Sequence, residues 1–192
     1  MRAAGGVQEL HAKDTTNTGT NLGDAVTPFL LNGLQRGTTI DSRVGRRIHM
    51  TSLLFTFQIY PGDSQTEDQD IKIFIVYDRQ SNANAPTNAQ VYANLPGATA
   101  PTSPRNLAHM DRFKVIYSKI LRVKSSADDK TTISRKKYFR LNLPTVYNSG
   151  STGNIGDISA GSLYFMAIGD TTLTSNNVPK MDFNCRIRFR DC

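Results

Sequence analysis

The chain has 192 residues, 38% hydrophobic and 8% aromatic, which is enough for one domain with a buried core and excludes a globally disordered chain. It carries 23 Lys and Arg against 16 Asp and Glu, and the resulting net charge of +7 favours a polyanionic partner, either nucleic acid or an anionic membrane surface. No apolar run is long enough for a membrane span.

The two cysteines, Cys185 and Cys192, lie on one predicted strand, where their side chains cannot reach each other. The opening residues lack the apolar core of a signal peptide. We therefore expect a soluble protein that matures in a reducing compartment, and not a secreted disulfide scaffold.

Strand-forming patterns dominate the chain and predict eight strands. The first is expected at 7–13, followed by a polar linker at 14–23. The other segments show either period-two alternation or a short apolar run rich in β-branched and aromatic residues. They lie at 46–60, 71–78, 113–124, 136–143, 153–159, 162–170 and 183–192, and the pattern at 153–159 is the weakest.

Side chains alternate between the two faces of a strand, so three of these segments have an apolar and a basic face. In the segment at 113–124, Lys119 interrupts the alternation, which predicts a β-bulge there. The apolar face of that segment carries Phe113, Val115, Tyr117, Leu121 and Val123. The apolar face of the final strand carries Phe183, Cys185, Ile187 and Phe189, and its other face carries Asn184, Arg186, Arg188 and Arg190. The segment at 136–143 separates Phe139, Leu141 and Leu143 from Lys136, Tyr138, Arg140 and Asn142.

A long proline-bearing excursion at 81–111 separates two of the strands. It contains the one good helix candidate, 86–95, which Thr87 or Asn88 could cap. A connection of this length usually covers a surface or contacts a partner. Eight strands with long, uneven connections favour Greek-key crossings, and hence an all-β, eight-stranded single jelly-roll sandwich. We expect one domain over 1–192, with a flexible start at 1–6.

Catalytic and metal-binding motifs are absent from the sequence. The three histidines, His11, His49 and His109, are not spaced as metal ligands, and no nucleophile motif occurs. We expect no enzymatic activity and no cofactor.

Basic residues recur beside or along several strands, with Tyr117 and Tyr138 between them. Guanidinium and ammonium groups that meet phosphates, with aromatics that stack bases, suit single-stranded nucleic acid. No recognition helix or zinc finger is present for sequence readout. The candidate nucleic-acid-binding residues are Arg43, Arg46, Arg47, Arg112, Lys114, Arg122, Lys124, Lys136, Arg140, Arg186, Arg188 and Arg190.

The segment RVGRRIHMTSLLFTFQIY, followed by IKIFIVYDRQSN, resembles the capsid proteins of circular, Rep-encoding single-stranded DNA viruses of the geminivirus and circovirus type. In that group an R-x-G-[KR]-[KR] entry leads a long strand, and a second strand ends in V-x-D-R, here Val76 to Arg79. The segments DRFKVIYSKILRV, LYFMAIGD and FNCRIRFRD follow in the same order. The resemblance covers roughly residues 40–191.

This resemblance implies a jelly roll of two four-stranded sheets, with the first strand beside the final one, that self-assembles into an icosahedral shell around single-stranded DNA. The smallest such shell is T=1. It also implies residence in the virion and assembly in the host nucleus. Two alternatives stay open: the coat protein of a satellite-type single-stranded RNA virus, and a non-viral jelly-roll module that binds a carbohydrate or another ligand. The second would be expected to expose aromatics over a concave sheet, and the chain has no Trp.

Such capsid proteins commonly begin with a basic arm, whereas only Arg2 and Lys13 precede Arg36 here. A shell of about sixty copies at +7 each would carry roughly 420 positive charges, fewer than the roughly 576 phosphates of its own gene. We therefore expect either a basic arm that this chain lacks, which is the preferred interpretation, or compensation of the remaining phosphates by other cations.

Overall fold

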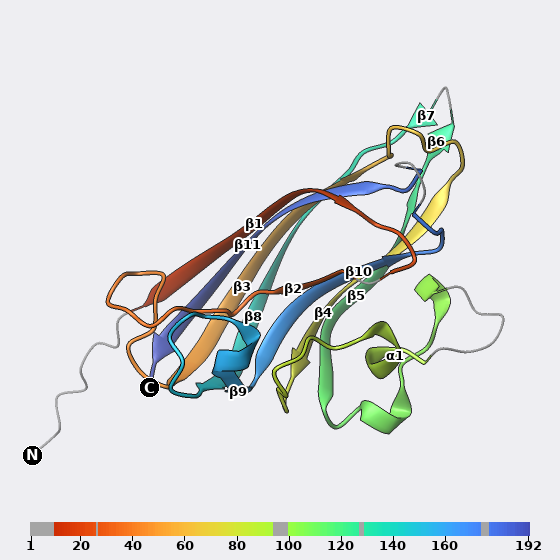
Figure 1. Cartoon of the computed structure of the whole chain (residues 1–192). Coiled ribbons are helices and arrows are strands. Elements are labelled where there is room, and N and C mark those ends of the chain that lie inside the picture. Colours follow the sequence, from red (N-terminus) through yellow and green to blue (C-terminus); the bar gives the residue numbers. More distant parts are fainter. Residues whose placement is uncertain (1–9, 26, 94–99, 127–128, 174–176) are drawn as a thin grey trace, which may run out of the picture.

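Two antiparallel β-sheets pack face to face in the computed structural model, which describes residues 10–25, 27–93, 100–126, 129–173 and 177–192 (Figure 1). The first sheet has the order β1 (His11–Asn21), β11 (Lys180–Asp191), β3 (Arg47–Tyr60), β8 (Ile133–Tyr147) and β9 (Ile158–Ala160). The second has the order β2 (Thr27–Leu30), β10 (Ser162–Gly169), β4 (Gln69–Asp78) and β5 (Phe113–Val123). The ribbon of β6 (Ser125–Ser126) and β7 (Asp129–Lys130) extends the turn between β5 and β8.

The chain crosses from one sheet to the other at almost every connection. β1, β3, β8 and β11 lie in the first sheet, whereas β2, β4, β5 and β10 lie in the second. Among the strands of these two sheets, only the steps from β4 to β5 and from β8 to β9 stay within one sheet. This Greek-key path through two four-stranded sheets confirms the predicted jelly roll, and β9 adds a short fifth strand to the first sheet.

The main core fills the space between the sheets. Its centre is a cluster of phenylalanine rings, in which Phe165 lies 4.7 Å from Phe55 and 5.1 Å from Phe183, measured between ring centroids. All three side chains are buried. The alternation of β11 supplies Phe183, Cys185, Ile187 and Phe189 to this core, as the sequence predicts.

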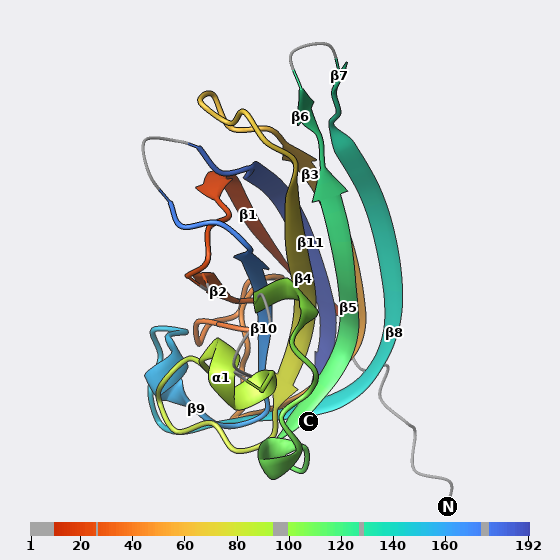
Figure 2. The same cartoon turned by 90° about the vertical axis from the view of Figure 1, so that its right-hand side faces the viewer.

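A second core lies on the other side of the second sheet. The excursion between β4 and β5 folds back over that sheet (Figure 2) and carries α1 (Asn88–Val91), η1 (Ala100–Thr102) and η2 (Leu107–His109). Val91 and Tyr92 pack there against Phe74 and Met166. Because β4 and β10 are buried on both faces, their sequences read as continuous apolar runs instead of alternating ones.

The structure departs from the predicted strands in three places. The segment at 14–23 is not a linker, because β1 runs through it and pairs with β11. As an edge strand with one exposed face, β1 needs few apolar residues, and its threonines favour extended backbone. β2 is missed because it has only four residues and contains Pro28. The segment at 153–159 is mainly the turn η3 (Ile155–Asp157), which leads into β9. Residues 7–9 and the expected flexible start at 1–6 lie outside the described residues.

The bulge in β5 falls at Ile116 and not at Lys119, because Tyr117 pairs with Ile75 while Val115 pairs with the next residue, Val76. The extra residue reverses the alternation, so the predicted single apolar face is split. Phe113 and Val115 join the second core, and Tyr117, Leu121 and Val123 join the main core.

The predicted helix is a single turn. Thr87 is the N-cap of α1, and its backbone N–H donates to Gln90 Oε1 at 2.9 Å. Residues 94 and 95 of the predicted helix lie outside the described residues. No helix in the described ranges is long and apolar enough to cross a membrane.

Candidate nucleic-acid interface

One face of the first sheet gathers cations from strands that are far apart in the sequence. Arg188 on β11 lies opposite Ser52 of β3, and Ser52 lies opposite Arg140 of β8. In the next rows the order is Arg186, Leu54 and Tyr138, and then Asn184, Thr56 and Lys136. All of these positions point away from the main core. We call the set of cations that this register creates the basic face: Lys136, Arg140, Arg186, Arg188 and Arg190.

Within the described part of the chain, Arg186 is the one member of the basic face that pairs with a carboxylate. Its Nε and Nη2 donate to Asp14 of β1 at 2.7 and 2.6 Å. These hydrogen bonds are the main reason that the pKa of Asp14 lies below its ordinary value. Among the described residues no carboxylate pairs with the remaining four cations, Lys136, Arg140, Arg188 and Arg190. They are therefore available to an external anion.

Tyr138 supplies an exposed aromatic ring to the basic face. It lies between Lys136 and Arg140 on β8 and is 59% exposed. Tyr117, the other predicted stacking residue, does not present its ring on the basic face. It is only partly exposed and packs against Phe139 in the core, with ring centroids 5.5 Å apart. The bulge at Ile116 explains this error, because it turns Tyr117 inward.

A hollow of about 360 Å³ adjoins the basic face where outward positions carry short side chains. Its walls include Thr16 of β1, Asn184 of β11, Thr56 and Gln58 of β3, and Ser134 of β8. Lys136 lies beside it, opposite Thr56. No sequence pattern marks this hollow, because its residues come from four strands whose order is apparent only in the folded sheet.

Two of the twelve candidates, Arg43 and Arg112, hold loops in place through hydrogen bonds and are not available to a ligand. Arg43 is 1% exposed, donates to the carbonyls of Leu34 and Gly45 at 3.3 and 2.7 Å, and stacks over the Tyr147 ring at 4.1 Å. A sequence cannot distinguish this desolvated arginine from a solvated one, because its acceptors are backbone carbonyls of other segments.

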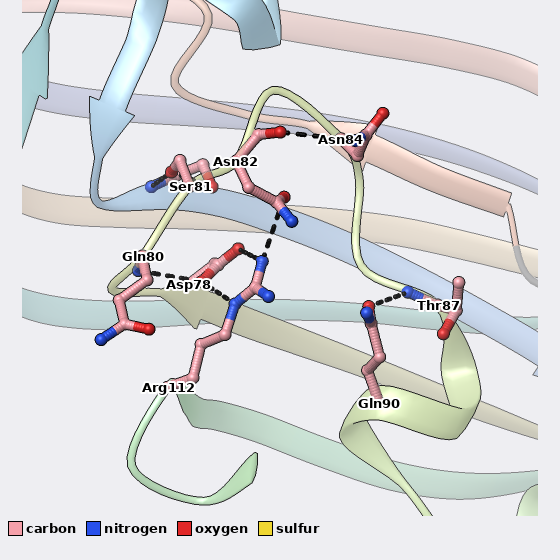
Figure 3. A network of polar contacts seen from close by, with 9 residues as sticks. Asp78, Gln80, Ser81, Asn82, Asn84, Thr87, Gln90 and Arg112 are labelled. Carbon is pink, nitrogen blue, oxygen red and sulfur yellow. Dashed lines mark hydrogen bonds and ion pairs between the residues drawn. The ribbon is translucent and has the colours of Figure 1, made fainter.

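Arg112 pairs with the fully buried Asp78, with its Nε and Nη2 2.9 and 2.8 Å from the two carboxylate oxygens (Figure 3). Arg112 also donates to Asn82 Oδ1 at 3.2 Å, and the backbone N–H of Gln80 donates to Asp78 Oδ1 at 3.0 Å. Asp78 is the acidic residue of the V-x-D-R motif. Because Asp78 ends β4 and Arg112 directly precedes β5, this ion pair holds the two ends of the excursion between β4 and β5 together.

The other candidates lie apart from the basic face. Arg122 on β5 pairs with Asp68 at 3.3 Å. Lys114, near the start of this edge strand, and Lys124, just after its end, are exposed. Arg46 and Arg47 are exposed where β3 begins, at the end of the first sheet to which Arg190 belongs. The fold thus brings five of the twelve candidates together. Across the described ranges, no three His, Cys, Asp or Glu side chains gather as metal ligands would.

Comparison with known proteins gives a family. The sequence profile of the geminivirus coat protein/nuclear export factor BR1 family matches residues 4–191. No curated protein matches the chain. Solved structures of plant viruses show a distant likeness. Desmodium yellow mottle tymovirus is 11% identical over 97% of this chain and 90% of its own, with a TM-score of 0.38. Cocksfoot mottle virus is 11% identical over 94% of this chain and 93% of its own, also with a TM-score of 0.38.

The family match includes the RVGRRIHM entry, the V-x-D-R strand end and the closing pair of strands, and it leaves out only three residues at the start and one at the end. The protein belongs to the geminivirus coat protein/nuclear export factor BR1 family and is a geminivirus-like capsid protein.

Proposed function

We propose that the protein assembles into a closed icosahedral shell around a single-stranded DNA genome, and that the basic face binds the phosphates of that genome. The observation that carries the proposal is the group of four cations, Lys136, Arg140, Arg188 and Arg190, which share one sheet face without a carboxylate partner among the described residues. Lysine and arginine bind phosphate independently of base sequence, as packaging of a whole genome requires.

The rest of the face suits a single strand better than a duplex. The exposed ring of Tyr138 can stack an unpaired base between two phosphate contacts. The hollow beside Lys136, whose exposed surface is mainly apolar, is large enough for a second base. A sheet has no helix to enter a major groove, so the contacts read the backbone and the base faces instead of a sequence.

In this arrangement the basic face points into the shell, and the protein has a structural role in the virion. Assembly takes place in the host nucleus, in keeping with the nuclear export factors that share the family. The smallest closed shell, T=1, is the expected particle.

The test is negative-stain electron microscopy of the purified chain, with absorbance at 260 and 280 nm measured on the same fraction. Uniform closed shells with a raised 260/280 ratio are expected. Nuclease digestion of the extracted polymer, with a DNase and an RNase in parallel, then distinguishes DNA from RNA. A protein that stays monomeric across a range of salt concentration and pH would refute assembly.

A further inference from the structure

An apolar knob stands out from the excursion between β4 and β5. The turn η2 exposes Leu107 and Met110, whose side chains are 78% and 45% accessible to solvent. Leu107 is the most exposed large hydrophobic residue of the described chain. In Figure 2 this segment lies at the lower end of the molecule, below α1 and just before β5 begins.

The knob is held rigidly despite its exposure. The Asn106 side chain accepts a hydrogen bond from the Ala108 N–H at 3.0 Å and donates one to the Ala89 carbonyl of α1 at 2.7 Å. The backbone N–H of Asn106 donates to Val91 O at 3.0 Å. A surface whose shape is fixed before binding loses less entropy on docking, which favours a specific contact.

A matching apolar hollow lies elsewhere on the same molecule. It has a volume of about 350 Å³ and is lined by Pro28 and Leu30 of β2, Tyr164 of β10, and Ala85, Asn154 and Ile155 from two loops. A cavity of roughly 150 Å³ admits benzene, so this hollow can take a leucine and a methionine side chain together. The knob of the same chain does not fill it, since Leu107 stays exposed.

We infer that Leu107 and Met110 of one copy dock into this hollow of the next copy. The occupant is a second copy because the chain itself carries an unfilled apolar hollow and a rigid apolar knob of compatible size, and because a capsid protein meets many identical copies. Knob and hollow are different surfaces, so the contact is head-to-tail, and within a closed shell it forms a ring about a symmetry axis. This inference rests on the proposed shell and names one contact within it.

Engineered disulfides test the contact directly. The background is Cys192→Ser, which removes the exposed thiol and leaves only the buried Cys185. To this background we add Leu107→Cys with either Ala85→Cys or Asn154→Cys in the wall of the hollow. The matched control combines Leu107→Cys with Ser64→Cys, an exposed position in the connection between β3 and β4.

After oxidation, non-reducing gels of either test pair should show a ladder of covalent oligomers, and the control should stay monomeric. A mixture of the single variants Leu107→Cys and Ala85→Cys should stop at the dimer, because each chain then offers only one half of the contact. Intact shells in which both test pairs stay monomeric would overturn the contact and leave the shell proposal standing. If no shells form, the shell proposal fails, and a ladder at high protein concentration would still support the contact, whereas its absence would overturn both.

A charge substitution gives an independent readout. Leu107→Asp should raise the protein concentration needed for assembly by at least about tenfold, because an anion cannot enter the apolar hollow without losing its hydration. Ile40→Asp is the matched control, since Ile40 is 67% exposed on a different loop. Far-ultraviolet circular dichroism checks that both variants fold. Equal assembly concentrations for the two variants would contradict the inference.

Discussion

Removing Arg140 and Arg188 together should weaken the binding of single-stranded DNA and reduce its dependence on salt. The two residues lie on either side of Ser52 in one row of the basic face. Both are exposed, so Arg140→Ala/Arg188→Ala should leave the fold unchanged. The matched control is Lys114→Ala/Lys119→Ala, which removes the same charge from β5 in the other sheet.

The expected magnitude follows from the number of unpaired cations on the basic face. Each phosphate contact to a single strand releases counterions, with a slope of about 0.7 in log K against log salt. Four contacts give a slope of about −2.8 for this face, and the double variant should retain about −1.4. At about 0.1 M salt two contacts amount to about 25-fold in affinity, or about 2 kcal/mol.

Fluorescence anisotropy with a labelled oligothymidine, titrated at several salt concentrations, measures both quantities. The control variant shares the net charge of the double variant, so it separates local phosphate contacts from the general field of the protein. Equal slopes for the double variant and the control would refute the assignment of the basic face, even if both bound more weakly than the unmodified protein.

Three further predictions concern ion pairs and thiols. Asp14→Asn should free Arg186 and raise the affinity for single-stranded DNA about fivefold at about 0.1 M salt. Because the pKa of Asp14 is lowered, the ion pair is lost only as pH falls through that lowered value, so the ratio of the variant's affinity to that of the unmodified protein should stay constant from pH 5 to 8. A drift of this ratio within that window would contradict the pairing. Arg112→Ala should cost about 3–5 kcal/mol in urea unfolding, since it leaves the carboxylate of Asp78 buried and uncompensated, and a cost below about 1 kcal/mol would contradict that role. Burial raises the pKa of Cys185 to about 12, so a thiol reagent at pH 8 should modify only the exposed Cys192 in the folded protein and both cysteines in denaturant. Rapid reaction of both cysteines in the folded protein would refute the burial of Cys185.

The sequence predicted best where a single strand carries its own pattern. Alternation alone identified the core and the solvent faces of β11 and of the stretch around Phe139, because successive side chains of any strand point to opposite sides. It failed where pairing decides the outcome. β1 is extended because β11 offers it backbone partners, and the bulge at Ile116 exists because β4 lacks a matching residue. In both cases the cause lies in the partner strand, β11 for β1 and β4 for β5, and not in the sequence of the strand itself.

The candidate site divides in the same way. The sequence by itself determined that the protein is an all-β chain of capsid type and that Arg186, Arg188 and Arg190 share one face, because period-two geometry is a property of the backbone. Only the tertiary structure decided which cations act together. Sheet order places Arg188 across Ser52 from Arg140, 48 residues away along the chain, while Arg43 is buried among carbonyls. Burial and pairing are long-range quantities, set by which segments pack together, and no window of sequence contains them.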